Sequence, residues 1–167
     1  MILNVVLFQL GWFACVLGAA SGYAREGAIA AALLVALHIA RAAQPKREAM
    51  LAAAAATLGF LFESALVQAG WVRFEAGMLL EGAAPYWMVA LWALFATTLN
   101  ESMRMLQTRP WIAALFGAVG GPLAYYAGAR MGALDLVHPA AMLAALALGW
   151  ALATPLLLSL ARRLNVP

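Results

Sequence analysis

Four polar side chains recur at helical spacing within one apolar segment, residues 85–106. They are Thr97, Asn100, Glu101 and Arg104, at positions i, i+3, i+4 and i+7. On a helix this spacing places them on one arc about 100° wide. Because exposed charge is costly in hydrocarbon, such an arc must face protein or water, and it is therefore a candidate functional site.

Glu63 is a second candidate for chemistry. It lies about eight residues, or roughly 12 Å, from one end of the apolar segment 49–71. It shares an arc with small residues, so we expect it to face the interior of a helix bundle. Two interpretations stay open: a proton-linked or ligand-binding carboxylate, or a neutral, hydrogen-bonded acid that holds two helices together.

Two polar residues of other segments, Asn4 and His38, are expected at a depth similar to that of Asn100 and Glu101. One interpretation is a polar cluster shared by three helices. The alternative is a set of separate interfacial residues, with Glu101 paired to Arg104 along its own helix. A lone histidine at a helix end is itself no sign of a metal ligand.

Aromatic residues suggest where a pocket could form. Trp12, Trp92 and Trp150 lie deep in their segments, where we expect packing or pocket residues. Tyr125 belongs to an aromatic group near the outer end of the bundle. This group either lines a pocket for an amphipathic ligand or forms an ordinary interfacial belt.

Several kinds of chemistry are excluded or have no support in the residues. Cys15 is the single cysteine, so neither an intrachain disulfide nor a cysteine metal cluster can form. No paired-histidine motif, glycine-rich phosphate loop or nucleophile elbow occurs, and we expect no metal and no cofactor. The net charge of +3 comes from scattered basic residues rather than a basic face, which argues against nucleic-acid binding.

Composition indicates the class of protein. Of the 167 residues, 66% are hydrophobic and 10% are charged, whereas soluble domains are about half apolar and about a quarter charged. We therefore predict an all-α, polytopic membrane protein, with residues 1–167 forming a single transmembrane helical domain. Its six predicted transmembrane helices cover residues 2–22, 26–43, 49–71, 85–106, 110–130 and 138–161.

The distribution of basic residues predicts the orientation. With six spans, seven lysines and arginines fall on the side that holds both termini, against three on the other side. Basic loops stay on the cytoplasmic side. The sequence thus favours a multi-pass protein of the bacterial inner membrane with both termini in the cytoplasm.

Small residues at spacings of three and four predict helix-packing seams. Gly11 and Gly18 form one such ridge in the first segment, and Gly117, Gly121 and Gly128 form another in the fifth. The alternative is that a chain rich in alanine and glycine produces such ridges by chance.

Three stretches resemble one known family. Residues 8–15 (FQLGWFAC), 92–100 (WALFATTLN) and 117–125 (GAVGGPLAY) are similar to a bacterial inner-membrane family of unknown function, the domain numbered twenty-eight seventy-eight. The resemblance extends over essentially the whole chain but implies no catalytic residue. Members of the family are often encoded near lipid-modifying and photolyase-like enzymes, which implies a lipid or light-stress context. The shared motifs coincide with Asn4, Gln9, Trp12, Glu63, Trp92, Asn100 and Tyr125.

Three functions stay open at this point. The first is a binding or transport module for a small amphipathic or lipid-like molecule, held by polar anchors. The second is a membrane-embedded enzyme that modifies a lipid, with Glu63 or Glu101 as acid or base. The third is an accessory subunit that contacts another membrane protein through a glycine ridge. Membrane lipids are the expected surroundings in all three, and the ligand-binding candidates are Glu63, Trp92, Thr97, Asn100, Glu101 and Tyr125.

Overall fold

The computed structural model describes residues 1–165, and most of these residues lie in six α-helices. The predicted all-α class is confirmed, and each predicted segment corresponds to one helix. Proline begins the third, fifth and sixth helices, at a position that needs no amide donor. The helices are α1 (Ile2–Ala20), α2 (Ala24–Arg41), α3 (Pro45–Gln68), α4 (Tyr86–Leu99), α5 (Pro110–Arg130) and α6 (Pro139–Asn165).

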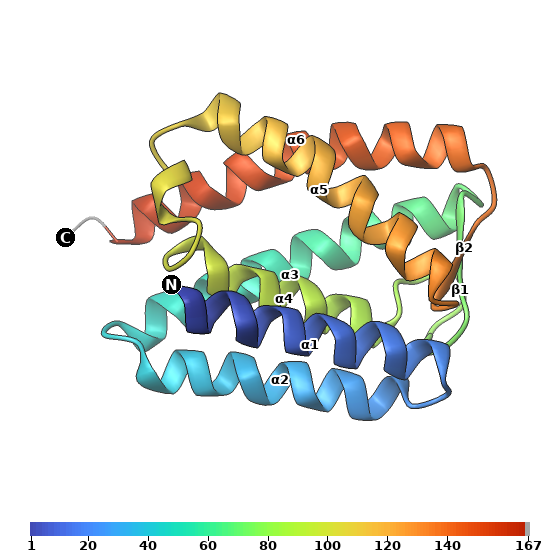
Figure 1. The fold of residues 1–167 in the computed structure, drawn as a ribbon, viewed down its shortest axis with the longest axis horizontal. Helices are drawn as coiled ribbons and strands as arrows, with labels where there is room; N and C mark the ends of the chain where they lie inside the picture. The colour runs from blue at the N-terminus through green and yellow to red at the C-terminus, as the bar shows by residue number, and fades with distance from the viewer. Residues whose placement is uncertain (166–167) are drawn as a thin grey trace.

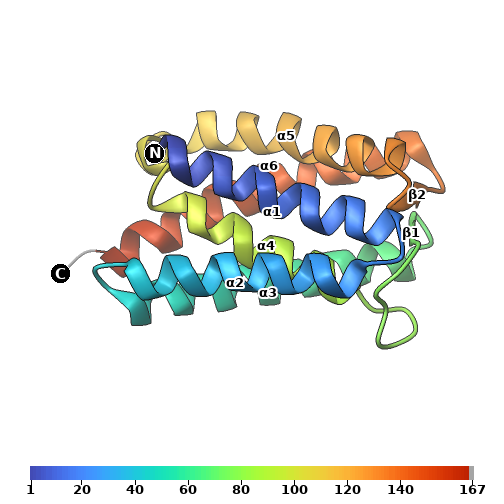
Figure 2. The same cartoon turned by 60° about the horizontal axis from the view of Figure 1, so that its bottom comes forward.

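The helices run roughly along one axis, and the beginning of α1 and the end of α6 lie at the same end of the bundle (Figure 1). A view rotated about this axis shows the same arrangement (Figure 2). Neighbours in sequence pack as pairs, α1 with α2, α3 with α4 and α5 with α6. Contacts between α3 and α6 join the last pair to the rest.

The short helix α4 occupies the centre of the bundle. Ten of its 14 residues are buried, and it contacts α1, α2, α3 and α6. A helix that is apolar on all sides is expected to be enclosed by other helices. The position of α4 therefore decides which side chains of its neighbours face the interior.

The prediction of one continuous helix over residues 85–106 is wrong beyond Leu99. A turn follows Leu99, and Arg104–Leu106 form a short 3₁₀ helix, η1. The Gln107 side chain donates a hydrogen bond to the carbonyl of Leu99 (3.0 Å), and the amide of Met103 donates to the carbonyl of Thr98 (2.8 Å). These bonds satisfy the free carbonyls at the helix end, so Asn100, Glu101 and Arg104 do not continue a helical arc.

Two short strands join loops at the end of the bundle opposite the termini (Figure 1). β1 (Val72–Phe74) and β2 (Leu134–Leu136) pair antiparallel, with Arg73 opposite Asp135. The predicted helices 49–71 and 85–106 leave residues 72–84 as a connection, in which no strand was predicted. Strands of three residues are too short to show a periodic pattern, and their partners lie far apart in the chain.

Four of the helices are long and apolar enough to cross a membrane: α1, α3, α5 and α6, the last as Pro139–Leu164. α4 is apolar but has only 14 residues, a length of about 21 Å at 1.5 Å per residue. α2 has charged residues at both of its ends. The structure thus has the character of a helical membrane protein, with four candidate spans among its described residues.

Candidate functional site

A cavity of about 590 Å³ lies between α1, α4, α5 and α6. Its size is within the range of sites that hold small molecules. Nearly all of its wall is apolar, and aromatic side chains of four helices contribute to it, among them Phe8, Trp92, Phe116 and Trp150. We call it the lateral cavity.

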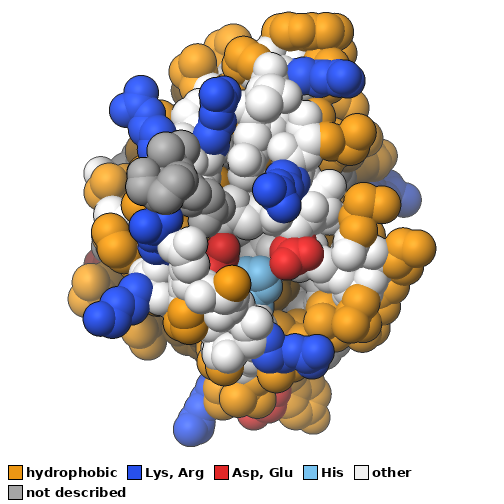
Figure 3. Space-filling model, turned by 90° about the vertical axis from the view of Figure 1, so that its left-hand side faces the viewer, with side chains coloured by type: hydrophobic (Ala, Val, Ile, Leu, Met, Phe, Trp, Pro, Cys, Tyr) orange, Lys and Arg blue, Asp and Glu red, His pale blue; other side chains and the backbone are white. Residues whose placement is uncertain are grey.

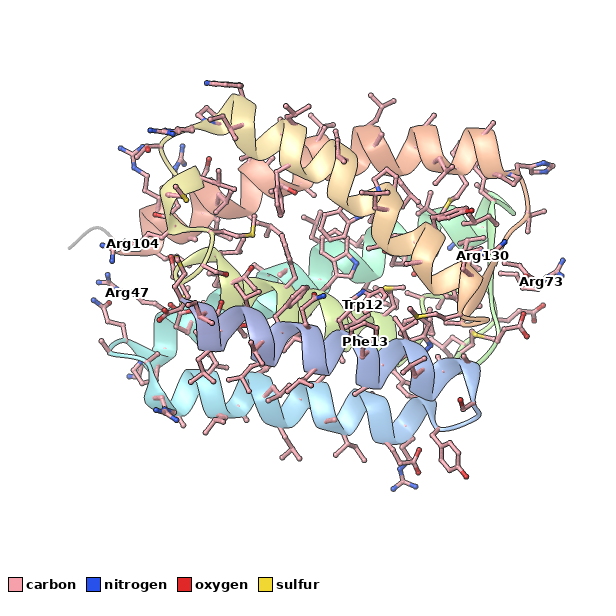
Figure 4. The ribbon with its side chains drawn as sticks, viewed as in Figure 1. Trp12, Phe13, Arg47, Arg73, Arg104 and Arg130 are labelled. Atoms are coloured by element: carbon pink, nitrogen blue, oxygen red, sulfur yellow. The ribbon has the colours of Figure 1, made fainter. Side chains whose placement is uncertain are left out.

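The lateral cavity opens to the side of the bundle, between α1 and α5. α1 packs on α2 and α4, whereas α5 packs on α6. Exposed apolar side chains flank the opening from both helices, Val5 and Phe13 on α1, and Phe116 and Leu123 on α5. Trp12 and Phe13 lie near the middle of α1 (Figure 4), and their rings meet edge to face, 5.0 Å apart.

Stacked indole rings form the inner wall of the cavity. The rings of Trp92 on α4 and Trp150 on α6 lie 4.4 Å apart at an angle of 20°. Glycines on neighbouring helices make room for them: a Cβ atom at Gly121 would collide with the Trp150 ring, and one at Gly59 with the Trp92 ring. The two indole rings can therefore occupy these places only because the facing helix positions are glycine.

A buried carboxyl group lies behind this wall. Trp92 Nε1 donates a hydrogen bond to Glu63 Oε1 at 3.0 Å, and the Tyr125 hydroxyl donates to the same oxygen. Glu63 is fully buried, and no described residue forms a hydrogen bond with its Oε2 atom. These three residues, the Glu63 cluster, connect α3, α4 and α5. Trp92 and Tyr125 line the cavity, while Glu63 lies one layer further in.

A second polar region lies at the termini end of the bundle. Glu48 accepts a hydrogen bond from Asn100 Nδ2 at 2.8 Å, and its other oxygen lies 3.1 Å from His38 Nε2. Gln107 Nε2 donates to Asn100 Oδ1 at 2.9 Å. We call these four residues the Glu48 network. Figure 3 shows this end of the molecule, with histidine and acidic side chains toward its middle and lysine and arginine side chains around them.

The predicted cluster of Asn4, His38, Asn100 and Glu101 forms only in part. His38 and Asn100 meet through Glu48, which sequence reasoning did not select. Asn4 instead donates to the carbonyl of Thr97 (3.0 Å) and accepts a hydrogen bond from Ser102 (2.8 Å). Glu101 is exposed.

The predicted ligand-binding residues therefore divide between two places. Trp92 and Tyr125 line the lateral cavity, and Glu63 lies directly behind them. The other three, Thr97, Asn100 and Glu101, lie outside the cavity lining. Trp12 and Trp150, expected as packing or pocket residues, also line it. Phe8, Gln9 and Thr154 also line the cavity. The sequence analysis did not assign them to a pocket, although Phe8 and Gln9 belong to a stretch that resembles the family.

The predicted packing glycines differ in how close their neighbours are. A Cβ atom at Gly117 would collide with the carbonyl oxygen of Trp150 on α6, and one at Gly18 would lie 2.7 Å from the carbonyl oxygen of Tyr23. At Gly11 the nearest atoms belong to side chains of α2 and α4, whereas Gly128 would make ordinary van der Waals contacts. The glycine ridge of α5 thus packs largely inside the chain, against α6.

Comparisons with known proteins place the chain in a family. The search of curated proteins and the search of solved structures both found no match. The family model described as "Protein of unknown function (DUF2878)" matches residues 1–156, almost the whole chain. The protein belongs to this DUF2878 family.

Proposed function

We propose that the protein is a binding or transport module of the bacterial inner membrane, and that its lateral cavity holds one lipid-like molecule. The observation that carries this proposal is an apolar cavity of about 590 Å³ with a side opening flanked by exposed apolar side chains. A water-soluble ligand would have to pass these exposed apolar side chains to enter, whereas a molecule already dissolved in the bilayer would reach the opening directly.

The proposal includes six membrane-embedded helices with both ends of the chain in the cytoplasm. Basic residues support this orientation, because they gather at the termini end of the bundle, and basic segments stay on the cytoplasmic side. They lie at the end of α2, the start of α3, in η1, before α5 and at the end of α6. They are Arg41, Lys46, Arg47, Arg104, Arg109, Arg162 and Arg163.

The shape of the cavity favours a ligand with a long apolar chain. On α1 the lining residues extend from Val5 to Val16, a distance of roughly 16 Å along the helix axis. That is about half the thickness of the hydrocarbon core of a bilayer. A chain lying parallel to the helices would therefore fill the site within the hydrocarbon.

Binding is favoured over catalysis by the position of Glu63. A general acid or base must come within hydrogen-bond distance of the reacting group. Trp92 and Tyr125 separate Glu63 from the cavity, and both use their polar atoms to hold its carboxyl group. The role of an accessory subunit has less support, because its proposed contact, the α5 ridge, already packs against α6.

Photocrosslinking tests the proposal. The purified protein is reconstituted with a phospholipid that carries a diazirine in its acyl chain, irradiated, and mapped by mass spectrometry. Lipids of the surrounding bilayer can label exposed residues such as Leu115, but only a chain inside the cavity can reach the cavity-lining Phe95, which is 8% exposed. We expect labelling at Phe95 and on the adjoining wall.

A pair of neighbouring variants controls this experiment. A Cβ atom at Gly120 would meet no described residue within 4 Å beyond its own stretch of α5, and Gly120 lines the cavity, so Gly120→Phe should fold and obstruct the site. Val119 lies outside the cavity lining and is 52% exposed. We expect Gly120→Phe to lose labelling at Phe95 and Val119→Phe to keep it. Labelling confined to exposed residues in the wild type would refute the proposal.

A further inference from the structure

An amide side chain stands at the mouth of the apolar cavity. Gln9 lines the cavity and is exposed on α1. Within the described residues 1–165, no hydrogen bond holds its side chain. It lies seven residues into α1, about 10 Å from the termini end of that helix. In the proposed membrane setting, this amide is in the hydrocarbon, where water cannot serve it.

Two further polar groups on the inner wall lack a partner within the described part of the chain. Thr154 is fully buried, and neither its hydroxyl oxygen nor Trp150 Nε1 has a hydrogen-bond partner among the described residues. Both residues line the cavity. Thr154 lies against Gly117, which is seven residues, about 10 Å, into α5. Because α1 and α5 both begin at the termini end (Figure 1), Thr154 and Gln9 lie at similar depths.

An unbranched hydrocarbon chain would leave all of these groups unsatisfied. Unpartnered polar groups in an apolar interior are rare and costly. The carbonyl and headgroup oxygens of an ordinary phospholipid stay near the membrane interface, about 15 Å from the bilayer centre if the hydrocarbon core is about 30 Å thick. A ligand that satisfies the cavity must instead bring an oxygen into its hydrocarbon part.

We propose that the cavity selects a lipid chain that carries a hydrogen-bonding oxygen partway along its length, with Gln9, Thr154 and Trp150 as the specificity-determining residues. A hydroxyl or ether oxygen on the chain would accept from the Gln9 amide, the Trp150 indole or the Thr154 hydroxyl. This inference rests on the proposed function, because it assumes that a lipid chain enters the cavity.

The test compares two fatty acids that differ in one group. The protein is reconstituted in phosphatidylcholine nanodiscs, and a fluorescent fatty acid is displaced either by a saturated long-chain fatty acid or by the same acid with a mid-chain hydroxyl group. Because one or two hydrogen bonds are gained, we expect about tenfold tighter binding of the hydroxylated acid by the wild type. Gln9→Leu and Thr154→Val should each lower this preference, because each variant removes one of the donors.

Matched substitutions elsewhere serve as controls. Gln68→Leu and Thr57→Val make the same chemical changes outside the cavity lining, since Gln68 bonds to a loop carbonyl and Thr57 to its own helix. Both should keep the tenfold preference.

Results that differ from these expectations show whether the inference on specificity or the proposed function is wrong. If the wild type binds both acids equally, the inference on specificity fails while the proposed function stands. If neither acid displaces the fluorescent one, the proposed function fails together with the inference. If Gln9→Leu separates an oligomer and leaves the preference intact, the amide serves contact between copies of the chain, and the inference is overturned.

Discussion

The two polar regions of this molecule differ in how completely their atoms are partnered. The Glu48 network at the termini end is a continuous chain of hydrogen bonds. Around the lateral cavity, Thr154, Trp150 and Glu63 each have one buried polar atom that finds no hydrogen-bond partner in the described part of the chain. Polar groups in the interior of folded proteins are nearly always satisfied. The Glu48 network therefore has the character of a structural contact between helices, and the lateral cavity has that of a binding site.

The largest effect is expected from breaking the satisfied region. Glu48→Leu removes a hydrogen-bond partner from each of the half-buried side chains His38 and Asn100, and a polar group that loses its partner in the folded protein costs about 1–3 kcal/mol. We therefore expect the free energy of unfolding to fall by roughly 2–4 kcal/mol, measured by denaturant titration in detergent micelles. Glu101→Gln, at an exposed position nearby, should change it little. Equal stability of the two variants would show that the Glu48 network does not hold the helices together.

An intermediate effect is expected where the cavity wall is tightest. Gly117→Ala places a methyl group against the carbonyl oxygen of Trp150, so α5 and α6 must separate. Overpacking of this kind costs about 1–3 kcal/mol, which a lower midpoint of thermal unfolding would reveal. In Gly120→Ala the added methyl group meets no described residue outside its own stretch of α5, and the gain in helix propensity should stabilise the protein slightly. If both variants lose the same stability, the close approach of α5 and α6 is not rigid.

The smallest effect should have the opposite sign. Thr154→Val keeps the shape of the side chain and removes a buried hydroxyl group for which the described residues offer no hydrogen-bond partner. We expect the ligand-free protein to become more stable by about 1 kcal/mol, because an unsatisfied polar group is lost. Thr57→Val, which gives up a hydrogen bond to the carbonyl of Ala53, should bring no such gain. Destabilisation by Thr154→Val would mean that this hydroxyl is satisfied in solution, and the contrast between the two regions would weaken.

Much of the fold could be predicted from the sequence because long apolar runs, proline and charged turns mark the helices directly. The error at the end of α4 has a specific cause. Thr97, Asn100, Glu101 and Arg104 have the same spacing in the sequence whether the helix continues to residue 106 or ends at Leu99. The spacing therefore cannot show where the helix ends. The two alternatives are distinguished by the hydrogen bonds of residues that come later in the chain, those of the Gln107 side chain and of the Met103 amide.

The candidate site could be predicted residue by residue but not as an assembly. Glu63, Trp92 and Tyr125 were selected individually, because each stands out in its own segment. Their meeting depends on which helices are neighbours in the bundle, and periodicity within a single helix carries no information on that. Gln9 and Thr154 acquire their significance only from a cavity formed by several helices, which explains why sequence reasoning missed them as pocket residues.

The length of the central helix has a consequence for how the chain is assembled. At roughly 21 Å, α4 is shorter than the hydrocarbon thickness of a bilayer, about 30 Å. Alone among lipids it would create a hydrophobic mismatch, thinning the bilayer around it. Its contacts with α1, α2, α3 and α6 replace those lipids with protein. In the proposed arrangement of six membrane-embedded helices, stable insertion of α4 thus depends on its neighbours, and it is completed only when α6, which follows α4 in the chain, takes its place.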